Sequence, residues 1–169
     1  AEYRQRMPES QQFIYYVCAE STQRAARLPQ VERIRDAGFE ILYLTEEVDE
    51  FVVNALGEVD GKAFKSVAAE DALPQTDEEK AALEKKAEEN KDVLEFIKQT
   101  LGDKIKEARI SKILKSGAVV MTADGPVSLE MERYFQKTGD GVPMKAERVL
   151  ELNPDSGAFA ALRDAVEND

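Results

Sequence analysis

The chain has 169 residues with 34 acidic and 23 basic side chains, and its formal net charge is −11. It holds one cysteine, no histidine and no tryptophan, which excludes a Ser-His-Asp triad, an imidazole metal site, an internal disulfide and a four-thiolate zinc site. An acidic chain without an apolar run of about 20 residues is also unlike a general nucleic-acid binder or a membrane-spanning protein.

Two strands with short helices between them open the chain. The aromatic and β-branched run 13–17 predicts a strand buried on both faces, and 39–44 predicts a second one. Between them, Ser21 is a candidate helix cap, and Pro29 suits the first turn of another helix that ends before Gly38. The order strand, helix, strand predicts a parallel βαβ unit.

A helix with an acidic start follows the second strand. We expect Thr45 to cap this helix. Its first turn is rich in carboxylates: Glu46, Glu47, Asp49 and Glu50. We interpret them as complementing the positive end of the helix dipole. A metal site is disfavoured, because the side chains of consecutive helical residues diverge and would not converge on one ion. Apolar residues recur at helical spacing: Val48, Phe51, Val52, Ala55 and Leu56. We expect Val48, Val52 and Leu56 to lie in the core and Phe51 at the exposed edge.

A segment without periodicity separates the chain into two parts. A turn signal at Asp60-Gly61 and a short strand at 63–67 close the first part. Residues 68–75 show neither helical nor strand periodicity, so we place a boundary there and expect a hinge. The predicted domains are therefore 1–72 and 75–169.

The second part begins with a capped helix. Thr76 and Glu79 form a capping-box pattern, and the helix is expected to continue unbroken to about Leu101. Three strands are then expected, of which the first two are predicted to pair directly in antiparallel fashion: 105–114, 118–122 and 148–152.

Two further helices belong to this part. One should begin near Pro126 and end at Gly139 and Gly141, and the other should run from Ser156 to about Val166. The predicted fold class is therefore α/β (α+β overall). It comprises a small βαβ-type subdomain, a long linker helix and a mixed three-stranded sheet with helices.

Four segments, in the same order, resemble the Hsp90 chaperone family. Residues 13–17 (FIYYV), followed by a serine, resemble its IYYITA(E/D)S strand, and residues 48–54 (VDEFVVN) resemble its (I/V)DEWMMN helix. Residues 60–67 (DGKAFKSV) resemble its DGKPFQSV segment, and Phe135 with residues 151–154 (ELNP) resembles its LF…ELNP segment. The resemblance covers almost the whole chain and is closest to the bacterial branch.

The resemblance implies a place in a longer chaperone. Residues 1–72 would be the C-terminal small subdomain of the middle domain, and residues 75–169 the C-terminal domain without its final dimerisation helices. In the family, the ATP pocket and the catalytic residues lie upstream. We therefore expect no catalytic residue, cofactor, metal or enzyme activity in this fragment, with ATP and Mg²⁺ used by the parent chain. The fragment would be a monomer or weak dimer, and the parent a homodimer.

The resemblance also implies a binding site for client proteins. It places client contacts at Phe51 and Asn54, where Phe51 replaces the family's Trp, and along the later helix at Val127, Met131, Tyr134 and Phe135. The opposing interpretation is that both apolar stripes are core. The implied partners are unfolded or partly folded proteins and co-chaperones such as an Hsp70 system, without nucleic acid or membrane, in a cytoplasmic role in protein folding and stress response.

Two other interpretations stay open. An α/β ligand-binding or enzyme domain would hold its ligand at the C-terminal ends of the parallel strands, near Ser21 and Thr45. A purely architectural spacer would use neither site. Cys18, without a histidine or a second thiol, is interpreted as a packing residue.

Overall fold

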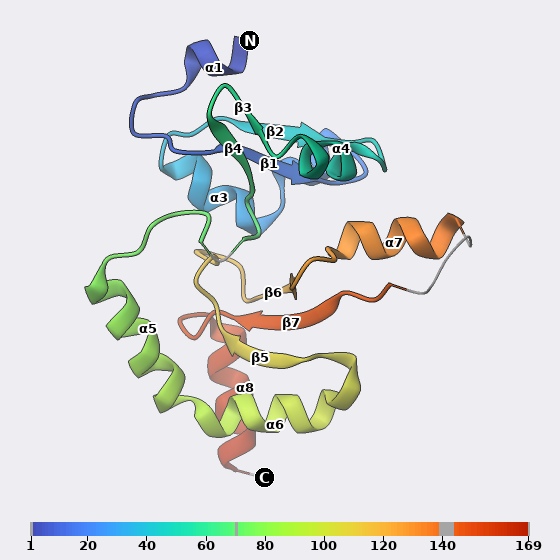
Figure 1. Cartoon of the computed structure of the whole chain (residues 1–169). Helices are drawn as coiled ribbons and strands as arrows, with labels where there is room; N and C mark the ends of the chain where they lie inside the picture. The colour runs from blue at the N-terminus through green and yellow to red at the C-terminus, as the bar shows by residue number, and fades with distance from the viewer. Residues whose placement is uncertain (1, 70, 139–143, 169) are drawn as a thin grey trace. The chain divides into compact units, whose positions relative to one another are not determined.

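The computed structural model describes residues 2–69, 71–138 and 144–168 (Figure 1). The chain divides into two compact units, Ala1–Leu73 and Pro74–Asp169. Each unit has its own sheet, with strand order β2-β1-β4-β3 in the first unit and β5-β7-β6 in the second. The predicted α/β class, with a mixed three-stranded sheet in the second part, is confirmed.

The first sheet is mostly parallel. Its central strands are β1 (Ile14–Cys18) and β4 (Lys62–Ser66), and β2 (Ile41–Leu44) pairs with β1 in parallel register from Tyr15 opposite Ile41 onward. A two-residue strand, β3 (Glu58–Val59), pairs antiparallel with β4 across the Asp60-Gly61 turn, where both residues have positive φ. The predicted parallel βαβ unit is confirmed.

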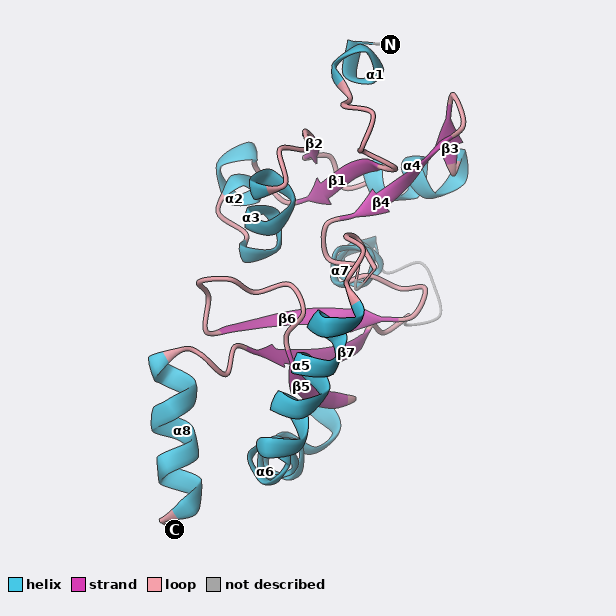
Figure 2. Ribbon diagram, turned by 90° about the vertical axis from the view of Figure 1, so that its left-hand side faces the viewer, coloured by secondary structure: helices cyan, strands magenta, loops and turns pink. Residues whose placement is uncertain are grey.

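Four helices accompany this sheet: α1 (Glu2–Arg6), α2 (Thr22–Ala26), α3 (Pro29–Asp36) and α4 (Asp49–Leu56). Helices α2 and α3 lie on one face of the sheet and α4 lies on the other (Figure 2). The connections explain this arrangement, because β2 and β4 flank β1 on opposite sides, and right-handed crossovers running in opposite directions place their helices on opposite faces.

Strand β1 is buried on both faces, as predicted. Tyr15 and Val17 join a core cluster with Val31 and Ile34 of α3. Since successive side chains of a strand alternate, Tyr16 points to the α4 face. Burial raises the pKa of the Tyr16 phenol, and the charge of Glu50 on α4 raises it further.

The predicted start of α4 is wrong. Thr45 does not cap the helix, which begins at Asp49 after a turn in which the Asp49 N–H donates to the Glu46 carbonyl at 3.1 Å. The Asp49 carboxylate accepts from the Glu46 N–H, also at 3.1 Å. This local bond closes the turn and delays the helix by one turn.

The long helix predicted for the second unit is two helices, α5 (Asp77–Glu89) and α6 (Lys91–Leu101). The capping box is confirmed, with both the Thr76 and the Glu79 bonds present. Asn90 interrupts the helix with φ −117°, and its buried side-chain amide donates to the Lys86 carbonyl at 2.7 Å. The side chain thereby competes with the backbone for a helical carbonyl, which accounts for the break.

The second sheet has β7 (Glu147–Leu152) at its centre, between β5 (Glu107–Ile110) and β6 (Val119–Asp124). Strand β5 is parallel to β7, and β6 is antiparallel to it. The predicted direct pairing of the first two strands is therefore wrong. Central β7 contains buried side chains such as Val149, and pairing on both edges satisfies its backbone hydrogen bonds.

A short 3-10 helix, η1 (Gly102–Lys104), precedes β5, and helices α7 (Leu129–Thr138) and α8 (Gly157–Glu167) follow β6 and β7. The Ser156 hydroxyl caps α8, as predicted. Side chains of α6, β5, β7 and α8, together with Ile105 between η1 and β5, form a core of this unit: Val93, Ile97, Ile105, Ile110, Leu152 and Phe159. Gly139 and Gly141, expected to end α7, lie outside the described residues.

A buried carboxylate ties the three strands together. Glu151 on β7 accepts from Arg109 at 2.9 Å and from the Ser111 hydroxyl at 2.7 Å. It also accepts from the Thr122 hydroxyl on β6 at 3.1 Å. With 2% of Glu151 exposed, these bonds replace the water that a carboxylate would otherwise bind.

Candidate functional site

Helix α4 turns an apolar line outward. Val48, Val52 and Leu56 are 49%, 50% and 57% exposed. The expectation that these three residues lie in the core is therefore wrong. Glu50 and Val53 are the buried residues of the helix, so the face toward the sheet is rotated away from the apolar line.

The two α4 residues of the implied client site are both at least partly accessible. Phe51 is half-buried, and Asn54 is exposed. Phe51, three residues after Val48, lies beside the start of the outward apolar line, whereas Asn54, two residues after Val52, points to a different side of the helix. The accessible part of α4 is thus wider than Phe51 alone.

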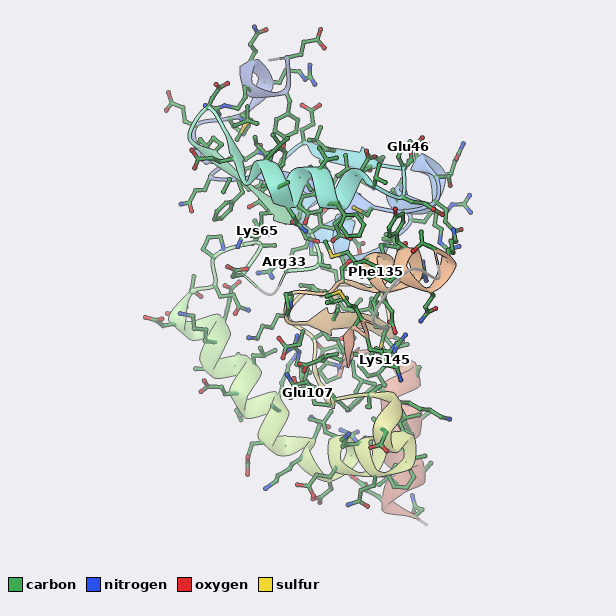
Figure 3. The ribbon with its side chains drawn as sticks, turned by 45° about the vertical axis from the view of Figure 1, so that its right-hand side comes forward. Arg33, Glu46, Lys65, Glu107, Phe135 and Lys145 are labelled. Atoms are coloured by element: carbon green, nitrogen blue, oxygen red, sulfur yellow. The ribbon has the colours of Figure 1, made fainter. Side chains whose placement is uncertain are left out.

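Carboxylates surround this helix. Six acidic residues and no basic residue occur between Leu44 and Gly61. Glu46, which Figure 3 labels, is exposed, as are Glu47 and Glu58, whereas Glu50 is buried. Their different exposures fit the interpretation that they do not converge on one point. No group of three His, Cys, Asp or Glu that could hold a metal occurs among the described residues.

Helix α7 carries the other implied client residues. Val127, just before the helix, and Met131 within it are buried, whereas Tyr134 and Phe135 are half-exposed. The two rings meet edge to face, with centroids 6.0 Å apart and planes at 71°, a favourable aromatic geometry. Phe135 is labelled in Figure 3.

An ion pair between α7 and the sheet fixes the orientation of this helix. The Glu132 carboxylate is 3% exposed and accepts from Arg148 on β7 at 2.6 Å. Gln136 donates to the same carboxylate at 3.3 Å, and the Ser128 hydroxyl accepts from the Met131 N–H at the start of the helix. Tyr134, two residues after Glu132, points to another side of the helix, whereas Phe135, three residues after Glu132 and four after Met131, lies at the edge of the inward face. The sequence analysis missed Glu132, since a helical glutamate is normally exposed.

The strand ends proposed as an alternative ligand site are occupied by local contacts. The Ser21 hydroxyl accepts from the Arg24 N–H at 3.2 Å, which confirms it as the cap of α2. Arg24 also pairs with Glu20 at 3.0 Å, and the Ala19 N–H donates to the Leu44 carbonyl. These bonds give Ser21 a structural role.

The second unit also contains an open cavity of about 600 Å³ between α6, α7 and the start of β7, which the sequence analysis did not anticipate. Two of its cations are matched by acids, since Lys106 contacts Asp124 and Glu147, and Arg148 contacts Glu132. Lys98 donates to two backbone carbonyls. The lining has five Lys or Arg side chains and three Asp or Glu side chains, so it is net basic, and the contacts of Lys98, Lys106 and Arg148 are structural.

No helix in the described part of the chain is both long and apolar enough to cross a membrane.

Comparison with known proteins places the chain in a family. The family model described as Hsp90 protein matches residues 1–169. The chaperone protein HtpG of Bacillus subtilis (strain 168) is 46% identical over 168 residues, which cover 99% of this chain and 27% of that protein. HtpG of Shouchella clausii (strain KSM-K16) is also 46% identical, and HtpG of Clostridium perfringens (strain 13 / Type A) is 42% identical, both over 169 residues.

The match thus covers 27% of the length of these relatives and at least 99% of this chain. The implied resemblance, with its four segments in order, is confirmed by the match over the whole chain. The chain belongs to the Hsp90 family of chaperones.

Proposed function

We propose that this chain supplies a client-binding surface of an Hsp90-type chaperone and links that surface mechanically to the ATPase half of the longer protein. The observation that carries the proposal is the half-exposed Tyr134–Phe135 pair on α7, a helix held to its sheet by the Glu132–Arg148 ion pair. Aromatic side chains on a firmly held helix offer apolar contact area without a large loss of side-chain entropy.

Helix α4 supports the same proposal from the first unit. Phe51 is half-buried and Asn54 exposed, so an apolar ring and an amide that can both donate and accept hydrogen bonds are available on one short helix. Unfolded proteins offer both apolar side chains and unpaired backbone groups, and this pair of residues suits both.

The remaining parts of the proposal concern the complete chaperone. ATP and Mg²⁺ would bind outside this chain, which itself needs no cofactor and would not hydrolyse ATP. Changes around residues 68–75 would alter the angle between the two domains, 1–72 and 75–169, during the ATPase cycle. The parent would act as a cytoplasmic homodimer, with unfolded clients and a co-chaperone system of the Hsp70 kind as partners, in folding and stress response.

The test is binding of a permanently unfolded protein, reduced and carboxymethylated α-lactalbumin, measured by fluorescence anisotropy with the 169-residue chain. The double variant Tyr134→Ser and Phe135→Ser should weaken binding at least about tenfold, since each half-exposed ring contributes about 1 kcal/mol or more. Met131 is left unchanged because it is buried, and its loss would disturb folding.

Arg133→Gln is the matched control, because Arg133 lies on the same helix and pairs only locally with Glu130 in the described contacts. This control should bind as the unchanged chain does. Equal affinity of the double variant, with an unchanged circular dichroism spectrum, would show that α7 is not a client surface. An ATPase rate proportional to the concentration of the purified chain would refute the assignment of hydrolysis to another domain.

A further inference from the structure

We propose that the outward face of α4, formed by Val48, Val52 and Leu56 and here called the α4 face, selects client segments that combine apolar side chains with Lys or Arg. The inference rests on the proposed function, since the occupant is a segment of a client protein. It adds a charge preference and three contact residues that the resemblance does not supply.

The geometry of the face limits what can bind. The three side chains are spaced by four residues and form one line along two turns of helix, about 12 Å long. Each is about half exposed. A line of this length is complementary to a short segment with two or three apolar side chains on one side, either a helix or an extended strand.

The charged residues of the segment that contains the α4 face have one sign. Between Leu44 and Gly61 the chain has six carboxylates and no Lys or Arg. Glu46 and Glu58 are exposed and lie in sequence just before and just after the face. An approaching acidic segment would meet like charges around the apolar line, whereas a basic segment would meet opposite charges.

Several cations of the same unit have contacts away from the α4 face. Lys62, the nearest in sequence, donates to the Gln11 carbonyl at 2.9 Å. Helices α2 and α3 lie on the other face of the sheet (Figure 2), and of their arginines Arg24 pairs with Glu20 and Arg35 contacts Tyr43. The partner of the α4 face is therefore defined by charge as well as by apolar contact.

The apolar and the acidic features need each other in this argument. Exposed carboxylates alone would serve solubility, and exposed Val and Leu alone would accept any apolar segment. Their combination predicts discrimination between client segments of equal apolar content, and that discrimination should weaken with salt because the carboxylates are exposed.

The test uses two fluorescein-labelled peptides with identical leucine positions, one carrying Lys and Arg between them and the other Glu and Asp. Anisotropy titrations with the 169-residue chain at about 50 mM NaCl should give about tenfold tighter binding of the basic peptide. At about 500 mM NaCl the preference should fall to about twofold.

Two variant pairs assign the effect to the α4 face. Val52→Ser with Leu56→Ser should weaken binding of the basic peptide about tenfold, whereas Val119→Ser, at an equally exposed valine of the other unit, should not change it. Glu46→Gln with Glu58→Gln should reduce the charge preference about threefold, whereas Glu78→Gln with Glu88→Gln on α5 should leave it intact.

The outcomes separate this inference from the proposed function. Equal binding of both peptides, or an unchanged affinity of the Val52/Leu56 variant, overturns the inference while binding of unfolded protein through Tyr134 and Phe135 stands. A failure of both peptides together with unfolded α-lactalbumin to bind overturns the proposed function and the inference with it.

Discussion

Replacing Glu132 by Gln should loosen α7 from the sheet of the second unit. The Glu132 carboxylate is 3% exposed and meets Arg148, which is 38% exposed, at 2.6 Å. A hydrogen bond to a charged group contributes about 1.5–3 kcal/mol. Because Arg148 keeps partial access to water, we expect a value near the middle, about 2 kcal/mol, which corresponds to about a thirtyfold change in an equilibrium constant.

Hydrogen exchange followed by mass spectrometry reports this change directly. Amides of Leu129–Thr138 should exchange up to about thirtyfold faster in Glu132→Gln, because local opening of α7 costs less. Glu130→Gln is the control, since among the described residues Glu130 pairs with Arg133, one turn away on the same helix, and it should change exchange by no more than about twofold.

A double variant provides the internal check. Adding Arg148→Gln to Glu132→Gln should cost less than the sum of the two single changes, because no unpaired cation is left at the sheet. If Glu132→Gln exchanges as slowly as Glu130→Gln, the ion pair does not hold α7, and the reasoning that links it to the orientation of Tyr134 and Phe135 is refuted.

Three further predictions concern stability. Glu151→Ala should lower the free energy of unfolding of the second unit by about 3–5 kcal/mol in urea titrations, whereas Glu147→Ala at the exposed end of the same strand should cost less than about 1 kcal/mol. Lys65 lowers the pKa of Asp71, so their contact stabilises the fold above the unfolded value of about 4 and is lost as the pH falls through the lowered value. The stability difference between the unchanged chain and Asp71→Asn, below about 1 kcal/mol, should therefore vanish in acid, and a persistent difference would contradict it. Gly61→Ala should destabilise the first unit by about 1 kcal/mol in thermal melts, because φ is +71° there.

Local features of the fold could be predicted from the sequence because a few adjacent residues determine them. The caps at Ser21 and Thr76 depend on a hydroxyl and a backbone N–H three residues later. The parallel pairing of β1 with β2 follows from two apolar strands with helices between them, but the predicted burial of the second strand is wrong, since β2 is a half-buried edge strand. Thr45 had the same residue type as these caps, yet the Asp49 carboxylate closed a turn first.

The candidate site could be predicted only in part. The resemblance names Phe51 and Asn54, and the structure leaves both at least partly accessible, but their role in binding clients stays a prediction. Periodicity assigned Val52 and its line to the core, because an apolar line at helical spacing usually faces inward. The spacing of apolar residues predicts that α4 has an apolar side, but it does not predict whether that side faces the sheet or the solvent. Here Glu50 and Val53 face the sheet, and the apolar line faces outward.

The order of the second sheet shows the same limit. The short connection between β5 and β6 favoured a hairpin, but β7, which comes later in the chain, lies between them. Which strand takes the central position depends on contacts between residues distant in sequence, such as that of Arg109 with Glu151.

The acidic charge, the lack of histidine, the capped helices and the buried strand β1 were all determined by the sequence itself, since each depends on composition or on neighbours a few residues apart. The direction of the α4 face, the place of β7 between β5 and β6 and the ion pair that holds α7 were decided only by the tertiary structure. The physical reason is the same for all three. Each depends on contacts between residues distant in sequence, which form only once the helices and strands pack, and a buried charge is stable only where its partner is present.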